Sequence, residues 1–244
     1  MSLQGRVVLL TRPAGSGALA ARLASLGARA VPRPTVVFGP PADPARVRAA
    51  AAQRYDWIAV TSPQGARALA AAMRPSARLA AVGEGTARVL RGMGLPPALV
   101  GTGDAASLAD VLLAAAHPGA RVLAVRPETA RDVLPEALSA GGLRVDAVPF
   151  YCTTAAPDVT ETARRVARGE FDAAVFSSPS TFQRLREAGQ AVRGFPEALA
   201  RLRRVAIGEV TASALARAGL PPSAVAERPS DEGLVEALVR AFSS

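Results

Sequence analysis

Val82-Gly83-Glu84-Gly85-Thr86-Ala87 recurs later in the chain as Ile207-Gly208-Glu209-Val210-Thr211-Ala212. Each copy follows a short apolar run and continues with helical spacing that stops at Gly-Leu-Pro-Pro, which predicts a buried strand, a loop of small residues and a helix. We expect the glycines to let the backbone turn sharply and the threonine hydroxyls to lie at a helix start, where N–H groups lack partners. Such a corner can bind an anion.

The repetition extends over most of the chain. The apolar run that ends in Arg12-Pro13 recurs before Arg126-Pro127, and the segment from Asp56 to Pro63 recurs from Asp172 to Pro179. The two copies lie about 115 to 125 residues apart, which indicates a duplicated supersecondary unit. Asp56 and Asp172 come just before their strands, and we interpret both as turn or capping groups.

Strands alternate with helices throughout, which predicts an α/β protein whose parallel sheets are covered on both faces. Each half is typical of an open, doubly wound sheet of flavodoxin type, and in such sheets ligands bind beyond the carboxyl ends of the strands. Ser62 and Ser178 precede prolines and also fit ordinary helix N-caps, and Arg12 and Arg126 also fit ion pairs. The candidate binding residues at these positions are Arg12, Thr61, Ser62, Gly83, Thr86, Arg126, Ser177, Ser178, Gly208 and Thr211.

The composition excludes several kinds of chemistry. All 29 basic residues are arginine, so a Schiff base on lysine is impossible and pyridoxal phosphate is excluded as a cofactor. One cysteine, Cys152, and one histidine, His117, leave no cluster for a zinc site, so we expect no metal. A glycine pattern at Gly15-Ser16-Gly17 lacks the acidic residue that a dinucleotide site needs, and we expect no cofactor.

The formal net charge is +9, which favours an anionic partner, although a coding bias toward arginine explains the excess equally well. Few aromatic residues and the lack of a basic run argue against nucleic acid. No apolar run approaches the roughly 20 residues that cross a bilayer. The first residues show no signal-peptide pattern, so we expect a cytoplasmic protein with no membrane partner.

Taken together in order and spacing, these motifs resemble the uroporphyrinogen-III synthase family. The resemblance covers nearly the whole chain. It rests on Val8-Leu9-Leu10-Thr11-Arg12-Pro13, Thr61-Ser62-Pro63, the two Gly-Glu-x-Thr-Ala blocks, Phe150-Tyr151, Phe176-Ser177-Ser178-Pro179 and the segment from Ser230 to Leu238.

The resemblance implies two flavodoxin-like domains joined by a two-stranded linker, with the active site in the cleft between them. Carried over to this chain, residues 1–34 and 154–244 form a discontinuous domain 1, and residues 35–153 form an inserted domain 2. The proline-rich stretch from Pro32 to Pro44 and the stretch from Thr153 to Pro157 lie where the crossings are expected. The family also suggests a monomer.

The resemblance further implies a cofactor-independent lyase that cyclises hydroxymethylbilane, a linear tetrapyrrole with eight carboxylates, and inverts ring D to give uroporphyrinogen III. Tyr151 matches the family's tyrosine, and we expect it to be the acid that helps the substrate hydroxyl leave. Thr61, Ser62, Ser178 and Thr211 match cleft positions and are expected to bind substrate, which hydroxymethylbilane synthase could hand over. The alternative is a two-lobed binding or sensor protein for an anionic small molecule.

Overall fold

The computed structural model describes residues 3–13, 15–130 and 132–243. The chain divides into two compact units. The first unit contains the residues up to Val37 and those from Thr154 onward, and the second unit contains Phe38–Thr153. Each unit has its own sheet and its own apolar cores.

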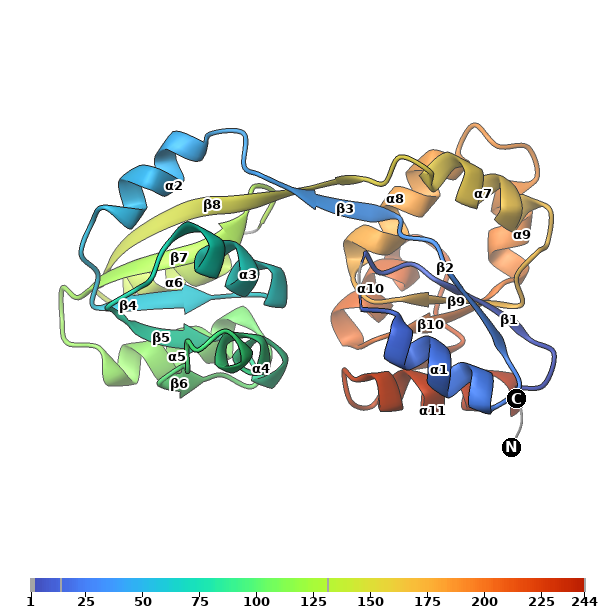
Figure 1. Ribbon diagram of the computed structural model, residues 1–244, viewed down its shortest axis with the longest axis horizontal. Helices are drawn as coiled ribbons and strands as arrows, with labels where there is room; N and C mark the ends of the chain where they lie inside the picture. Colours follow the sequence, from blue (N-terminus) through green and yellow to red (C-terminus); the bar gives the residue numbers. More distant parts are fainter. Residues whose placement is uncertain (1–2, 14, 131, 244) are drawn as a thin grey trace. The chain divides into compact units, whose positions relative to one another are not determined.

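The first unit contains a five-stranded sheet in the order β11-β10-β9-β1-β2, with every pair of neighbouring strands parallel (Figure 1). Its strands are β1 (Val7–Leu10), β2 (Arg29–Pro32), β9 (Ala173–Phe176), β10 (Arg203–Ala206) and β11 (Ala224–Val225). Its helices are α1 (Gly17–Ser25), α7 (Val159–Ala167), α8 (Pro179–Gly189), α9 (Phe195–Arg201), α10 (Glu209–Arg217) and α11 (Asp231–Ser243).

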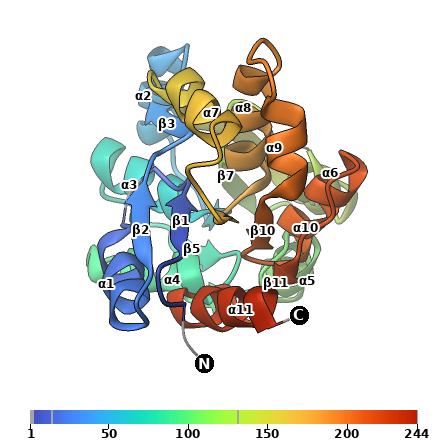
Figure 2. The same cartoon turned by 90° about the vertical axis from the view of Figure 1, so that its right-hand side faces the viewer.

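Successive residues of β1 point to opposite faces of this sheet, as strand geometry requires. Leu9 packs with α7 to α10 in one core, whereas Val8 and Leu10 pack with α1 and α11 in the other. Figure 2 shows α1 and α11 together on one side of the sheet. The strands are therefore buried on both faces, which explains their continuous apolar character.

The second unit contains a six-stranded sheet in the order β3-β8-β7-β4-β5-β6. Its strands are β3 (Val36–Gly39), β4 (Trp57–Val60), β5 (Arg78–Ala81), β6 (Leu99–Val100), β7 (Arg121–Pro127) and β8 (Arg144–Ala155). Its helices are α2 (Pro44–Ala51), α3 (Pro63–Ala72), α4 (Glu84–Gly92), α5 (Ala105–Ala115) and α6 (Val133–Ala140). Helices α2 to α4 pack on one face and α5 and α6 on the other.

The two sheets confirm the predicted α/β class and the doubly wound architecture. By sequence repeat, β7 corresponds to β1, β4 to β9 and β5 to β10, so the order β8-β7-β4-β5-β6 matches β2-β1-β9-β10-β11. Each sheet therefore combines the beginning of one repeat with the end of the other. The chain passes between the units through β3 and β8, which both extend across the boundary residues. Helices α7 and α9 are not among the elements that the sequence patterns predict.

The two aspartates that precede strands have equivalent structural roles. Asp172 accepts a hydrogen bond from Val7 N at 2.8 Å and pairs with Arg6 at 3.1 Å. Asp56 accepts one from Arg121 N, also at 2.8 Å. Each carboxylate therefore ties the start of its own strand to the start of the neighbouring strand, at the sheet edge opposite the strands' carboxyl ends.

We predict that Asp172→Ala lowers the free energy of unfolding by about 1.5 kcal/mol, because a strand N–H loses its charged acceptor. Urea unfolding followed by circular dichroism measures this. Asp110→Ala is the matched control, since Asp110 is exposed on α5 and no polar partner is found for it among the described residues. An Asp172→Ala midpoint equal to that of the control would contradict the assigned role.

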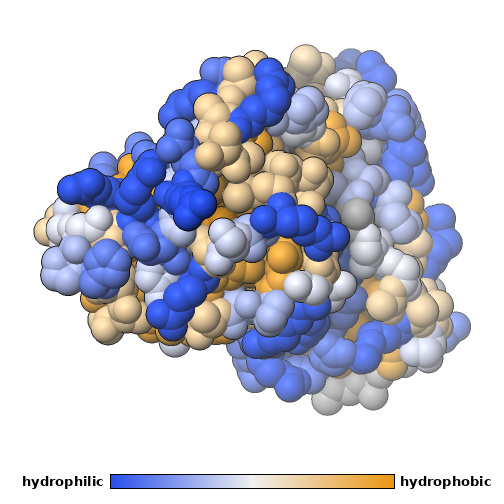
Figure 3. All heavy atoms as spheres, turned by 60° about the vertical axis from the view of Figure 1, so that its left-hand side comes forward, coloured by the Kyte–Doolittle hydropathy of each residue, from blue (hydrophilic) through white to orange (hydrophobic). Residues whose placement is uncertain are grey.

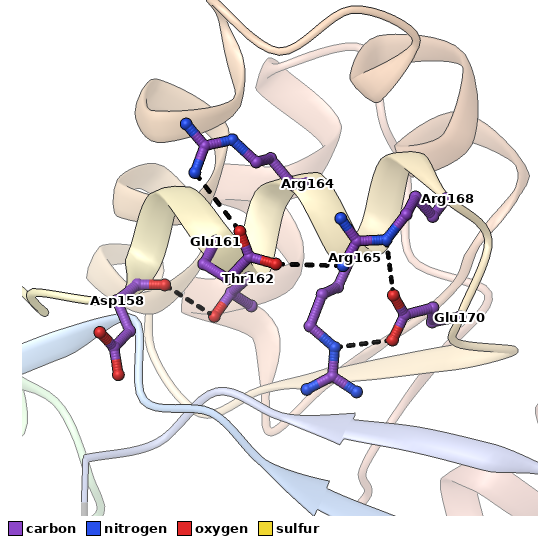
Figure 4. Close-up of polar contacts among 7 residues, drawn as sticks. All are labelled: Asp158, Glu161, Thr162, Arg164, Arg165, Arg168 and Glu170. Carbon is purple, nitrogen blue, oxygen red and sulfur yellow. Dashed lines mark hydrogen bonds and ion pairs between the residues drawn. The ribbon is translucent and has the colours of Figure 1, made fainter.

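A network of charged side chains covers α7 and the turn that follows it (Figure 4). Glu170 accepts from Arg165 Nε and Arg168 Nε at 2.7 Å each, and Arg168 also reaches Glu161 at 3.0 Å. The two guanidiniums hold the pKa of the Glu170 carboxyl below its ordinary value. The guanidinium of Arg165 also stacks over Phe171, 5.1 Å from the ring centroid. The network therefore stabilises the turn between α7 and β9, which Asp172 ends.

Within the described ranges, no helix is long and apolar enough to cross a membrane. No group of three or more His, Cys, Asp or Glu residues in the same part of the chain is arranged to hold a metal ion.

Candidate functional site

The second unit brings four of the predicted site residues into one pocket. Thr61 and Ser62 follow β4, Arg126 lies near the end of β7, and Tyr151 lies on β8, so all four reach the carboxyl edge of the parallel sheet. They line a pocket of about 220 Å³. The sequence interpretation missed its remaining walls, which are mostly apolar and come from β7, α5, α6 and the segment before α6: Ala105, Ala124, Pro127, Ala130, Leu134 and Pro135.

Ser62 joins the helix cap to the tyrosine. Its Oγ accepts from Gly65 N at 2.9 Å, which caps α3 ahead of Pro63 as the Ser-Pro pattern predicts. The same Oγ lies 2.9 Å from the Tyr151 hydroxyl. Beside it, the Thr61 hydroxyl donates to Val125 O at 3.1 Å. The N-cap and binding interpretations of Ser62 are thus compatible, because one oxygen contacts both groups.

The environment of Tyr151 keeps its phenol protonated. The residue is only 5% exposed, and this burial raises the pKa of its hydroxyl, while the hydrogen bond with Ser62 lowers it by a smaller amount. The ring of Phe38 meets the Tyr151 ring edge-on at 5.7 Å and fixes its plane. A neutral phenol that lines this pocket is available as a proton donor at physiological pH.

Tyr151 also borders an apolar hollow of about 560 Å³ in the second unit. The hollow lies among α2, α3, β3 and β8, and its lining is apolar apart from Arg48, Gln64 and Tyr151 itself. Figure 3 shows apolar residues, coloured tan to orange, exposed between hydrophilic ones on the surface. The Tyr151 side chain thus borders two mostly apolar hollows, while its hydroxyl has Ser62 as a polar partner.

Arg126 is held by its own segment. Its guanidinium pairs with Asp132 and donates to Ala130 O at 2.7 Å, whereas Nε is buried and has no hydrogen-bond partner among the described residues. The ion-pair interpretation is therefore confirmed for Arg126. The unpaired Nε leaves one donor of this pocket-lining side chain unused.

The glycines at the starts of α4 and α10 are not turn glycines. Gly83 and Gly208 are N-caps with no side-chain capping bond, so the first N–H groups of each helix remain available to an anion. The expected sharp glycine turn is wrong, because φ is −176° at Gly83 and 174° at Gly208, which is extended backbone. Gly83 is instead required by close approach, since a Cβ there would lie 3.0 Å from Gly103 Cα. At Gly208 nothing lies within 4 Å of such a Cβ.

Thr86 and Thr211 are the third residues of α4 and α10 and are only 2% and 3% exposed. Their backbone N–H groups bond to Gly83 O and Gly208 O at 3.1 Å each. Both threonines therefore lie at the helix starts, as expected, with their side chains packed into their units. Gly83 and Thr86 are not among the residues that line the Tyr151 pocket.

The predicted residues of the first unit also follow strands that end at one edge of its sheet. Ser178 caps α8 through a bond from Thr181 N at 3.3 Å and contacts Ser180 Oγ at 2.9 Å. Ser177 precedes it, directly after β9. Arg12 follows β1 and pairs with Asp231 at 2.8 Å, so it too forms an ion pair. Within the part of the chain that the structure describes, its buried Nε and Nη2 have no hydrogen-bond partner.

Comparisons with known proteins point to one family. The family model described as "Uroporphyrinogen-III synthase HemD" matches residues 17–236. A uroporphyrinogen-III synthase of Synechococcus elongatus is 33% identical over 176 residues, which are 64% of this chain and 65% of that protein. No finding favours the sensor-protein alternative.

Two solved structures share the fold. A mutant uroporphyrinogen III synthase of Thermus thermophilus superposes with a TM-score of 0.70 at 27% identity, covering 98% of this chain and 99% of that one. The uroporphyrinogen-III synthetase of Helicobacter pylori gives a TM-score of 0.60 at 13% identity, over 96% and 98% of the two chains. With nearly the whole chain matched by the family model, this protein belongs to the uroporphyrinogen-III synthase family.

Proposed function

We propose that this protein cyclises hydroxymethylbilane to uroporphyrinogen III with inversion of ring D and loss of water, without a cofactor. The observation that carries the proposal is the buried, neutral phenol of Tyr151, 2.9 Å from Ser62 and in one pocket with Thr61 and Arg126. Membership of a lyase family supports it.

In the proposed reaction Tyr151 is the general acid. Its phenol donates a proton to the hydroxyl of the substrate as the carbon–oxygen bond breaks, so that water leaves and an azafulvene cation remains. The substituted α-carbon of ring D then attacks the azafulvene and forms a spiro pyrrolenine. The bond between the spiro carbon and the methylene bridge to ring C breaks, which leaves a second azafulvene on ring C. The free α-carbon of ring D attacks this azafulvene and closes the macrocycle, and the proton lost when ring D regains aromaticity returns to the phenolate. Protons balance over the cycle. Ser62 donates to the phenolate while it exists, since its Oγ–H has no other acceptor in the contacts described.

Carboxylates of the substrate are proposed to bind to the positive groups at the carboxyl edges of the two sheets. The uncapped helix starts after Gly83 and Gly208 offer backbone N–H groups. The guanidiniums of Arg12 and Arg126 add positive charge at these edges. Ser178 and the neighbouring Ser177 add hydroxyls in the first unit. Holding a linear chain by its acidic side chains brings its ends together and favours ring closure by proximity.

We also propose the finer organisation that the family resemblance implies. Residues 1–34 with 154–244 and residues 35–153 would be two domains with the substrate cleft between them. The enzyme would work as a monomer in the cytoplasm and accept hydroxymethylbilane from the synthase that makes it.

The decisive experiment is analysis of the product isomer. Hydroxymethylbilane is incubated with and without the protein, and the oxidised porphyrins are separated by chromatography. We expect the type III isomer with the protein and the spontaneous type I isomer without it. Type I product at the uncatalysed rate, with hydroxymethylbilane retained by the protein in equilibrium dialysis, would instead support a binding protein.

A further inference from the structure

The duplicated fold provides an internal comparison for the Ser62–Tyr151 pair. Thr61-Ser62-Pro63-Gln64-Gly65 of the second unit corresponds to Ser177-Ser178-Pro179-Ser180-Thr181 of the first. Both serines cap the following helix, α3 in one case and α8 in the other. The third helical residue differs, because it is Gly65 in one copy and Thr181 in the other.

The capping serine behaves differently in the two copies. Ser62 Oγ accepts from Gly65 N at 2.9 Å and reaches the Tyr151 hydroxyl at 2.9 Å. Ser178 Oγ accepts from Thr181 N at a longer 3.3 Å and contacts the Ser180 hydroxyl. The Thr181 hydroxyl itself bonds back to Ser178 O at 2.8 Å. Where the third helical residue has a side chain, as at Thr181, the capping hydrogen bond is longer. The capping serine then contacts a residue of its own turn.

The space around Gly65 is tight. A Cβ at this buried glycine would lie 3.2 Å from Ser62 Oγ, 3.4 Å from Val125 Cγ1 and 3.6 Å from Val60 Cγ1. The two valines belong to the fully buried core of the second unit and would be at ordinary van der Waals distance from the added Cβ. Ser62 Oγ is the neighbour that would have to move, away from its hydrogen bond with Tyr151.

We propose that Gly65 is a positioning residue for the reaction, whose missing side chain keeps Ser62 Oγ aimed at the phenol of Tyr151. The part of this inference that concerns turnover rests on the proposed function. The position of Ser62 Oγ relative to Tyr151 can be tested without any turnover.

The first test is a titration. The chain has two tyrosines, so in a Tyr55→Phe background Tyr151 is the only phenol whose ultraviolet ionisation signal is seen. Because the bond from Ser62 lowers the pKa of Tyr151, Gly65→Ala is expected to raise that pKa, and Ser62→Ala to raise it at least as far. Gly92→Ala is the matched control, since Gly92 ends helix α4 in the same unit and nothing lies within 4 Å of its added Cβ.

The second test is a double-mutant cycle on turnover. Gly65→Ala is expected to lower kcat about fivefold with KM little changed, since a shift of a few tenths of an ångström misaligns the acid without removing a binding group. In the Ser62→Ala background the same change is expected to have no further effect, because the atom it displaces is gone. Gly92→Ala is expected to retain full activity.

Three outcomes separate the proposals. An unchanged Tyr151 titration in Gly65→Ala, with a shifted one in Ser62→Ala, overturns the positioning role. An equal loss of kcat from Gly65→Ala with and without Ser62 also overturns it and assigns the effect to packing against Val60 and Val125. A shifted titration with turnover unaffected by Tyr151→Phe supports the positioning of Ser62 and contradicts the acid role of Tyr151.

Discussion

Tyr151→Phe is expected to lower kcat for the type III isomer about 100-fold while leaving the free energy of unfolding nearly unchanged. The substitution removes the hydroxyl that would protonate the leaving group, and general acids contribute roughly 100-fold or more to rate. The ring, its packing in the core and its edge-on contact with Phe38 all remain. The measurement is the initial rate of type III formation, with the isomer ratio determined in parallel.

Tyr55→Phe is the control for this experiment. Tyr55 lies just before β4, at the opposite end of that strand, and its guanidinium neighbour is Arg121. We expect its rate to equal that of the unchanged protein. Wild-type turnover in Tyr151→Phe would remove Tyr151 from the chemistry and leave its hydroxyl a packing group.

The pH dependence follows from the direction of the Tyr151 shift. Burial raises the pKa of the phenol above its ordinary value of 10.0, so the donor stays protonated through the neutral range. An acid is lost above its pKa, and the alkaline limb of kcat due to Tyr151 is therefore expected only above about pH 10. A rate that falls between about pH 7 and 9 would point to a different acid.

Arg204→Met is expected to destabilise the first unit by on the order of 3 kcal/mol, the largest stability effect that we predict. The Arg204 guanidinium is nearly buried, at 9% exposure. Its Nη1 donates to three carbonyl oxygens at the end of α9, those of Leu199, Ala200 and Leu202, at 2.8, 2.8 and 2.6 Å. Its Nε and Nη2 donate to Pro221 O at 3.2 and 3.1 Å. Methionine fills much of the same volume but leaves these acceptors without a donor.

Urea unfolding monitored by circular dichroism measures the loss, and the denaturant midpoint is the quantity to compare. Arg217→Met is the matched control, because Arg217 is exposed on α10 and has no polar partner among the described residues. Arg204→Lys is expected to recover only part of the stability, since one ammonium cannot reach all four carbonyls. Equal midpoints for Arg204→Met and Arg217→Met would contradict the prediction. They would show that the four carbonyl oxygens do not need the Arg204 guanidinium as their hydrogen-bond donor.

Short-range patterns in the sequence predicted much of the local structure. The Ser-Pro pairs at Ser62 and Ser178 are helix N-caps because a serine oxygen and the fixed φ of proline suit a helix start whatever surrounds it. Asp56 and Asp172 were expected to be turn or capping groups, but each bonds to the start of a neighbouring strand, which no local pattern places beside it. The glycines were harder. The extended φ at Gly83 shows that spacing alone cannot distinguish a turn glycine from one that makes room for a neighbour. Gly208 is extended too, but no described atom lies within 4 Å of a Cβ added there.

By itself, the sequence determined the α/β class, the duplicated strand and helix plan, and the edge of each sheet at which polar residues collect, since these follow from periodicity and local capping. Only the tertiary structure decided which candidates meet. Ser62 and Tyr151 are far apart in sequence and touch because β4 and β8 lie on either side of β7. The burial of Thr86 and Thr211 likewise depends on packing. Contacts of this kind are set by which repeat supplies each strand, and no local pattern encodes that choice.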